Sequence, residues 1–354
     1  MKRSVAFFGL VLGAVAGLAA QSVSLTNTFG GNSDNVGTSD FLKFANDGTK
    51  VTAIVGDRVQ LDFASEHIDS RVRLNVSGDA GYIPSVQGYV NFRPFDWLNV
   101  IGGNKFFWKW TTSGAYLGAI DDYLVHGKLA DDNGAGVVLN FTSKEKDFGV
   151  TVAGAFGSIS RLDLNFGAQF FLKDAFVVGV TAQDVTEKSF SLGGYFGLNL
   201  VKNLLFNVGY TYNNVDATYI QATQNLIQAS TGYKFEDIGL ELYGDLLIGL
   251  NNRSSYNAAT DAYDELAQGI PVYSKVRAHY VLNDYFDLNG AFTVNHSLAA
   301  DSSLTSFTVY PYFDYKTKKA GTFRAGVRVF FDDATGYKGL NIPFSWQYKI
   351  AATF

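Results

Sequence analysis

The stretch IPFSWQYKIAATF, residues 342–354, decides the fold. From residue 344 every second side chain is apolar or aromatic, and this set is Phe344, Trp346, Tyr348, Ile350, Ala352 and Phe354. Because a β-strand points successive side chains to opposite faces, the pattern predicts a strand with one apolar and one mostly polar face. In a soluble sheet a second protein layer must cover the apolar face, whereas in a transmembrane barrel the lipid covers it.

A final amphipathic strand that ends in Phe resembles the C-terminal signature of bacterial outer-membrane β-barrels. In that family the barrel-assembly machinery reads this signature. The resemblance implies that Phe344, Trp346, Tyr348 and Phe354 form an assembly signal.

The first residues have the pattern of a secretory signal peptide. Lys2 and Arg3 precede an apolar run at 5–18, and Ala19 and Ala20 follow it. A basic start, a short apolar core and small residues predict cleavage after Ala20 or one residue earlier. We therefore expect a signal peptide at 1–20 and a single barrel at 21–354. The chain contains no cysteine, which excludes disulfide bonds and a lipid-modified N-terminal cysteine.

The composition is typical of an exported β-structure. Apolar residues make up 47% of the chain, yet no run after the signal peptide has the roughly 18 apolar residues of a membrane helix. The 37 glycines, 30 phenylalanines and 20 tyrosines suit an aromatic-rich barrel. The net charge of −5 argues against nucleic acid as a partner.

Period-2 alternation recurs along the rest of the chain and predicts an all-β protein. The predicted strands are 22–29, 52–65, 70–77, 86–93, 97–104, 135–142, 148–156, 161–171, 175–183, 189–199, 204–213, 227–235, 239–248, 272–281, 286–296, 305–315, 321–331 and 342–354. Short turns alternate with long loops between them, which is the pattern of a single closed antiparallel transmembrane β-barrel with periplasmic turns and extracellular loops. Eighteen strands are expected, and sixteen is the alternative. A secreted sandwich or propeller is the rival fold, but its strands average about 5–6 residues.

Three further stretches resemble treponemal (spirochaete) outer-membrane porin-type proteins. They are GYVNFRPFDW from residue 88, RVFFDD from residue 328 and NIPFSWQYKIA from residue 341. This resemblance bears on the source of the chain and carries no mechanism.

If the apolar set faces lipid, the alternate set lines the barrel interior and is rich in charge. Its basic members include Arg71, Arg73, Arg277, Arg324, Arg328 and Lys349, and its acidic members include Asp62, Asp163, Glu241 and Asp245. Closure of the barrel would make the strands that carry Arg324, Arg328, Lys349, Arg71 and Arg73 neighbours. These charges either border an aqueous pore or form ion pairs that stiffen a plugged barrel. Barrels of sixteen to eighteen strands leave a water-filled channel, so the strand number favours the pore. Position 326 falls on the same inward set, where we expect a charged substitution to be tolerated.

The longest loop, 105–134, carries Asp121 and Asp122. In trimeric general porins the third loop folds into the barrel and narrows it. The resemblance implies that this loop could set its acids against the arginines, and that the chain could form a homotrimer. The loop lacks the Pro-Glu-Phe-Gly turn of those porins, and the alternative is an external loop with aromatic residues at the membrane interface.

No pattern in the sequence indicates an enzyme. The four histidines lie in no metalloprotease, nucleophile-elbow or phosphate-loop motif, and no metal or cofactor is expected. The sequence therefore predicts an outer-membrane porin that forms a water-filled channel for passive diffusion of small hydrophilic solutes. The alternative is a structural or adhesive barrel whose extracellular loops bind host or neighbouring molecules.

Overall fold

The computed structural model describes residues 22–31, 42–45, 51–53, 56–77, 83–104, 134–157, 163–186, 190–198, 200–214, 222–257, 262–265, 270–299 and 302–353. Most of these residues belong to β-strands. The expected signal peptide at 1–20 lies outside the described residues, and so does nearly all of the loop at 105–134. In the described part of the chain, no helix is long and apolar enough to cross a membrane.

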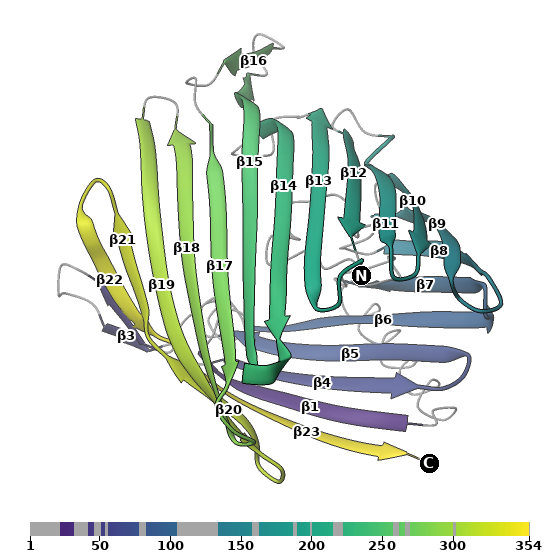
Figure 1. Cartoon of the computed structure of the whole chain (residues 1–354), viewed down its shortest axis with the longest axis horizontal. Helices are drawn as coiled ribbons and strands as arrows, with labels where there is room; N and C mark the ends of the chain where they lie inside the picture. Colours follow the sequence, from purple (N-terminus) through teal and green to yellow (C-terminus); the bar gives the residue numbers. More distant parts are fainter. Residues whose placement is uncertain are drawn as a thin grey trace.

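The strands form one antiparallel sheet (Figure 1). In chain order they are β1 (Ser22–Gly31), β2 (Leu42–Ala45), β3 (Val51–Ala53), β4 (Gly56–Ala64), β5 (Ile68–Ser77), β6 (Ile83–Phe95), β7 (Leu98–Asn104), β8 (Gly134–Thr142), β9 (Phe148–Phe156), β10 (Leu164–Leu172), β11 (Phe176–Gln183), β12 (Phe190–Leu198), β13 (Leu204–Asn214), β14 (Ala222–Phe235), β15 (Leu240–Asn257), β16 (Ala262–Glu265), β17 (Val272–Val281), β18 (Phe286–Ala299), β19 (Ser302–Thr317), β20 (Gly321–Gly326), β21 (Arg328–Asp332), β22 (Gly336–Ile342) and β23 (Phe344–Thr353). A 3₁₀ turn, η2 (Glu236–Ile238), joins β14 to β15.

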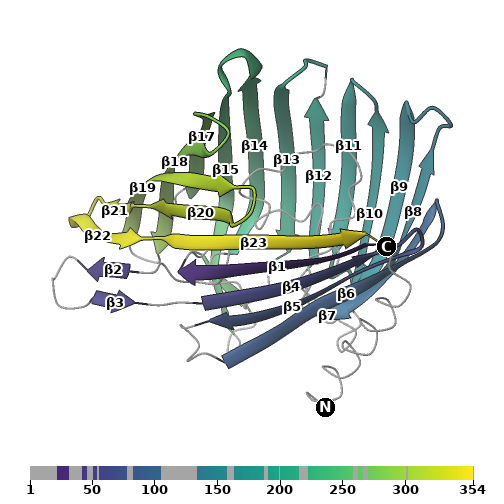
Figure 2. The same ribbon diagram turned by 90° about the horizontal axis from the view of Figure 1, so that it is seen from below.

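The sheet closes because its first strand pairs with its last. β1 pairs with β23 from Ser22 opposite Thr353 to Gly31 opposite Phe344. The other edge of β1 pairs with β4, so β23, β1, β4 and β5 lie side by side (Figure 2). β2 pairs with both β22 and β3, which extends the pairing beyond the ends of β1 and β4.

The closed barrel has 18 strands, because β20 with β21 and β22 with β23 each form one interrupted strand, and the short strands β2, β3 and β16 add no strand of their own to the barrel. The prediction of an all-β closed antiparallel barrel is confirmed, and the alternative of sixteen strands is wrong. The two predicted strands nearest the N-terminus are present, since β1 and β4 pair with each other along their lengths.

Two prolines explain the interrupted strands. Pro343 separates β22 from β23, and Pro311 on β19 lies beside Val327, which separates β20 from β21. Proline has no backbone N–H to donate to a neighbouring strand. The segment that contains Gly326 and Val327 runs between the two prolines and donates backbone hydrogen bonds to their carbonyl groups. The Gly326 N–H bonds to the Pro343 carbonyl at 3.2 Å, and the Val327 N–H bonds to the Pro311 carbonyl at 3.0 Å.

Gly326 has no room for a side chain. A Cβ atom built there would lie 2.5 Å from the Cβ of Tyr312 and 2.6 Å from the carbonyl oxygen of Pro311. The expectation that a charged side chain would be tolerated at position 326 is therefore wrong, because the backbone of the neighbouring strand approaches too closely.

The two faces of the wall differ as the alternation predicts. Large apolar side chains of the outward set are exposed, among them Phe166, Phe196, Phe292, Val309 and Trp346. Buried side chains of the inward set include many polar ones, among them Asn207, Thr211, Gln228, Asp287 and Asp314. This arrangement is the reverse of a soluble sandwich, and an apolar outer surface of this kind faces lipid.

Short turns join the strands at one end of the barrel. Several of them place a non-glycine residue in the left-handed region, including Asp174 with φ 53° and Asn203 with φ 65°. Asp and Asn tolerate this conformation better than other side chains, because their short polar groups bond to nearby backbone. The short turns that the sequence predicts at 172–174 and 200–203 therefore have the residues they require.

Candidate functional site: the inner wall

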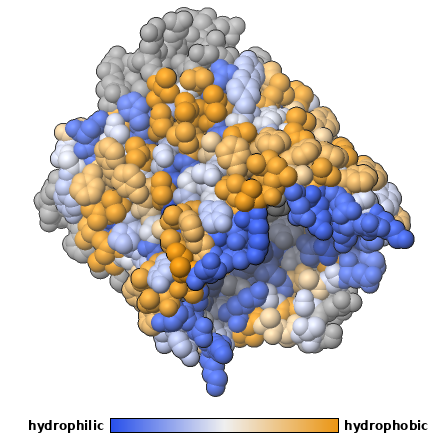
Figure 3. All heavy atoms as spheres, in the orientation of Figure 1, coloured by the Kyte–Doolittle hydropathy of each residue, from blue (hydrophilic) through white to orange (hydrophobic). Residues whose placement is uncertain are grey.

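We call the inward side chains of the barrel strands the inner wall, and its two sides differ. On β8 to β13 the inward side chains are buried: Val138, Thr151, Gln169 and Asn207 are at most 6% exposed. On β4, β5 and β17 to β20 many inward side chains are charged and partly exposed. Figure 3 shows a hollow bordered by hydrophilic residues, with apolar residues spread over much of the outer surface in view. The part of the inner wall that meets solvent is therefore its charged part.

One charged group spans β4 and β5, and we call it the β4–β5 ladder. Its members are Arg58, Gln60, Asp62, Arg71, Arg73 and Asn75, and the register pairs each residue of β4 with one of β5. Arg71 Nε donates to Asp62 Oδ1 at 2.6 Å. Arg73 donates through Nε and Nη2 to Gln60 Oε1, at 3.0 and 2.7 Å. Arg58 Nε donates to Asn75 Oδ1 at 2.7 Å.

The β4–β5 ladder carries excess positive charge. Asp62 offsets the charge of Arg71, but the amide oxygens that Arg58 and Arg73 bind are neutral. Gln60 Nε2 donates to Asp62 Oδ2 at 2.7 Å, which turns the amide oxygen of Gln60 toward Arg73. The Gln60 amide thus links Arg73 to Arg71 through the Asp62 carboxylate, but it does not offset the positive charge of Arg73.

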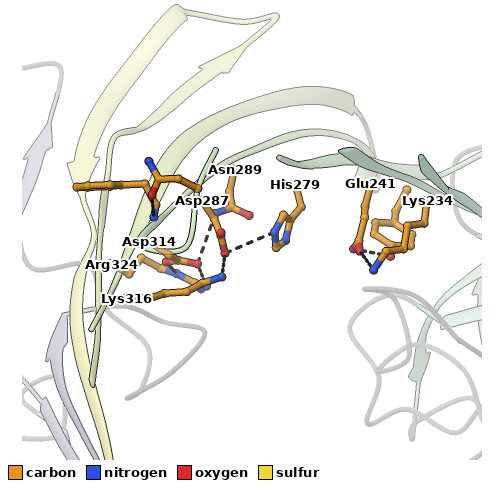
Figure 4. Close-up of polar contacts among 11 residues, drawn as sticks. Lys234, Glu241, His279, Asp287, Asn289, Asp314, Lys316 and Arg324 are labelled. Carbon is orange, nitrogen blue, oxygen red and sulfur yellow. Dashed lines mark hydrogen bonds and ion pairs between the residues drawn. The ribbon is translucent and has the colours of Figure 1, made fainter. Parts of the chain in front are cut away.

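A second group crosses β17 to β20, and we call it the β17–β20 network (Figure 4). Its members are His279, Asp287, Asn289, Asp314, Lys316 and Arg324. Arg324 binds Asp314 with two parallel hydrogen bonds, Nε to Oδ1 at 2.7 Å and Nη2 to Oδ2 at 2.9 Å. The Lys316 ammonium contacts Asp287, and His279 Nε2 lies 3.5 Å from Asp287 Oδ2.

The acids of this network are less exposed than the bases. The Asp287 side chain is 1% exposed and that of Lys316 is 43%, while the values for Asp314 and Arg324 are 10% and 26%. A buried carboxylate requires a partner, and each base here supplies one. Solvent therefore meets ammonium and guanidinium groups, although each pair is neutral as a whole.

In a neighbouring group on β14, β15 and β17, the acids are again less exposed than the bases that bind them. Arg277 Nη2 lies 3.4 Å from Asp245 Oδ2, and the Asp245 side chain is fully buried. Glu241 accepts from Lys234 Nζ at 2.9 Å and from the Tyr243 hydroxyl at 2.9 Å. Two predicted acids of the inner wall, Glu241 and Asp245, are thus both engaged by bases.

Tyrosine rings hold four of the arginines. The guanidinium carbon lies over a ring at 5.9 Å for Arg71 on Tyr89, 5.4 Å for Arg277 on Tyr243, 4.6 Å for Arg324 on Tyr312 and 4.6 Å for Arg328 on Tyr310. The rings of Tyr310 and Tyr312 also stack on each other, with centroids 4.6 Å apart. Such stacking stabilises the cation and restricts the flexible arginine side chain.

The structure brings together the strands that carry the predicted basic residues. β20 pairs with β23, β23 with β1, and β1 with β4, so Arg324 and the β4–β5 ladder lie on adjoining parts of the inner wall. Lys349 lies between them on β23, opposite Thr26. Asp163 is buried, at 2% exposure, immediately before β10.

Sequence reasoning missed several members of the inner wall. Arg58 lies two residues before Gln60, so the same alternation would have assigned it to the inward set. Asp287 and Asp314 likewise alternate with Leu288 and Phe313, which are exposed on the outward set. The alternation of the sequence was therefore enough to place Arg58, Asp287 and Asp314 on the inward set.

Three of the residues of the expected assembly signal, Phe344, Trp346 and Tyr348, lie on the outward set of β23. Trp346 Nε1 donates to the carbonyl oxygen of Ala320 at 2.5 Å, which ties the last strand to the turn between β19 and β20. Phe354 lies outside the described residues, as do Asp121 and Asp122.

The described residues offer no centre for metal chemistry, since no group of three or more His, Cys, Asp or Glu is arranged to hold an ion there. At the turn end, Lys202 Nζ lies 2.9 Å from Glu236. This lysine holds the pKa of the exposed Glu236 carboxyl below its usual value.

No family model matches the sequence, and no curated protein matches it. Solved structures do resemble the fold. The outer membrane protein OpdK of Pseudomonas aeruginosa aligns with a TM-score of 0.58 at 8% identity, over 94% of this chain and 99% of that one. OccAB4 of Acinetobacter baumannii aligns with a TM-score of 0.59 at 8% identity, over 94% and 97%. Wzi of Escherichia coli, an outer membrane protein involved in capsule assembly and a carbohydrate-binding β-barrel, aligns with a TM-score of 0.56 at 10% identity, over 97% and 87%. The fold of this chain is therefore that of an integral outer-membrane β-barrel.

Proposed function

We propose that the chain forms a water-filled channel through which small hydrophilic solutes diffuse passively. The observation that carries the proposal is an 18-stranded barrel with a partly exposed, charged inner wall. Barrels of sixteen to eighteen strands enclose an aqueous channel, whereas eight-stranded barrels are filled by their own side chains. The likeness to porins of the Opd and Occ type supports the same function.

The inner wall favours anionic over cationic solutes in this proposal. Arg58 and Arg73 keep their charge at any relevant pH, and their cross-strand partners are neutral amides. The acids of the β17–β20 network lie behind their bases. Salt screens these charges over about 8 Å at physiological ionic strength, so the preference is strongest in a narrow lumen at low salt.

Two substitutions of opposite sign test this role of the inner wall. Arg73→Gln removes a positive charge, and Asp62→Asn leaves Arg71 without its carboxylate partner. The reversal potential across a salt gradient in a planar bilayer should move toward cation selectivity for Arg73→Gln and toward anion selectivity for Asp62→Asn. Asp174→Asn, in an exposed turn, is the matched control and should leave the potential unchanged. If neither inner-wall variant moves the potential, the β4–β5 ladder lies away from the conduction path.

A second candidate function is a structural or adhesive barrel whose loops bind other molecules. The likeness to Wzi favours it, because that barrel binds carbohydrate. Conductance separates the two functions, since an adhesive barrel with a closed lumen passes no current. A homotrimer, a third loop that narrows the pore and assembly through the C-terminal signal remain part of the first proposal.

A further inference from the structure

One acidic residue of the barrel wall points outward. Asp57 on β4 lies opposite Phe29 on β1 and alternates with Val59, Leu61 and Phe63, which belong to the outward set. In the barrel strands that the structure describes, no other position of the outward set carries Asp, Glu, Lys or Arg. Ionisable residues at membrane depth nearly always face an interior or a water-filled cavity, so an outward one marks a site.

Asp57 lies in a groove on the outer surface. The groove has a volume of about 700 Å³, and its lining includes Asn27, Phe29, Asp57, Phe323, Phe344 and Trp346. Phe344 packs edge-on against Phe29 and Phe323, with ring centroids 6.4 and 5.0 Å apart. Apart from its Asn27–Asp57 end, the surface of the groove is mostly apolar.

The groove extends to the short turn between β19 and β20, because Ala320 and Gly321 of that turn also line it. The indole of Trp346 donates to the Ala320 carbonyl and so fixes this end of the groove. Asp57 lies at the opposite end of the groove, near the start of β4 and away from the short turn that joins β4 to β5. Because Phe29, Asp57 and Trp346 belong to the outward set, the groove is open to the lipid layer around the barrel.

The described side chains satisfy the Asp57 carboxylate only in part. Asn27 Nδ2 donates to Asp57 Oδ1 at 2.7 Å and also approaches the carbonyl oxygen of Arg58 at 3.4 Å. The side chain of Arg58 points inward to Asn75, so its charge is on the other face of the wall. A carboxylate with one neutral donor beside hydrocarbon is costly, and a cationic ligand would offset that cost.

We propose that this groove binds a phospholipid with a primary ammonium headgroup, with the ammonium on Asp57 and an acyl chain against the aromatic residues. Charge complementarity selects this occupant over a second copy of the chain. The outward set of the described strands contains no Lys or Arg, so another barrel packed face to face would bring no cation to Asp57. An ammonium with three N–H donors can bind the carboxylate directly, whereas a quaternary choline headgroup has no donor.

Native mass spectrometry of the full chain, extracted from vesicles of equal phosphatidylethanolamine and phosphatidylcholine, tests the proposal. The expected result is retention of phosphatidylethanolamine over phosphatidylcholine by roughly tenfold, the ratio that one charge-assisted hydrogen bond produces. Asp57→Asn should abolish the preference, and Asp57→Glu should restore most of it. Asp174→Asn, which removes an exposed carboxylate elsewhere, should retain the preference of the wild type.

Heat-modifiable mobility on a gel establishes first that each variant is a folded barrel. Equal retention of both lipids by the wild type would overturn the proposal, and so would an undiminished preference in folded Asp57→Asn. Multimers that carry no lipid and dissociate on Asp57→Asn would also overturn it, because they would make the groove an interface between protein copies.

Discussion

An arginine placed at Val309 should damage the barrel far more than one placed at the adjacent Thr308. Val309 lies midway along β19, is 39% exposed and has Phe292 and Val329 as its register partners. Thr308 points to the inner wall, where its partners Thr293 and Phe330 carry no charge. The two positions therefore lie on opposite faces of the barrel wall but at nearly the same depth in the membrane.

The expected magnitude follows from the membrane depth of Val309. Arginine on the lipid face costs about 2–4 kcal/mol at the bilayer midplane and little in an aqueous lumen. At about 1.4 kcal/mol per tenfold, this lowers the ratio of folded to unfolded protein by roughly 30-fold to 1000-fold. Urea unfolding of protein refolded into vesicles, followed by tryptophan fluorescence, measures the difference. Equal loss of stability for Val309→Arg and Thr308→Arg would refute the assignment of faces.

Three further predictions concern stability, each measured by the same urea unfolding. Lys316→Met should cost about 3–5 kcal/mol, because it leaves the buried Asp287 carboxylate without its lysine partner. Asp287→Asn should cost only about 1–3 kcal/mol, because the Lys316 ammonium is solvated. Equal costs would contradict the claim that the acid is buried and the base is exposed. Gly326→Ala should cost about 1–3 kcal/mol through overpacking, whereas Gly290→Ala, with open space around its Cβ, should be neutral or better. Trp346→Phe should cost about 0.5–1.5 kcal/mol through loss of its hydrogen bond to the β19–β20 turn, and an unchanged midpoint would argue against that bond.

Alternation was sufficient to predict the barrel because the membrane simplifies the packing problem. One face of every strand must be apolar, so residues such as Phe292 and Val309 stand out against polar neighbours. The same alternation assigned Arg71, Arg73, Arg324 and Arg328 to the inward set. What it could not give was the partner of each charge, because pairing across strands depends on register.

Register explains the main gaps in the sequence reasoning. Asp314 binds Arg324 only because β19 and β20 pair with these two residues opposite each other. Gly326 looks like any inward position in the sequence, but the register brings Tyr312 and the Pro311 carbonyl against it. Asp57 lies within the predicted strand 52–65, and the pairing of β4 with β1 shows that it shares the outward set with Val59, Leu61 and Phe63.

The measurement that tests the central claim most directly is current through single molecules of the full chain in a planar bilayer. Discrete, uniform opening steps are expected, because barrels of sixteen to eighteen strands leave an aqueous channel. The steps should be larger for anions than for cations at low salt. A bilayer that stays silent after insertion of folded protein, confirmed by heat-modifiable mobility, would contradict the channel.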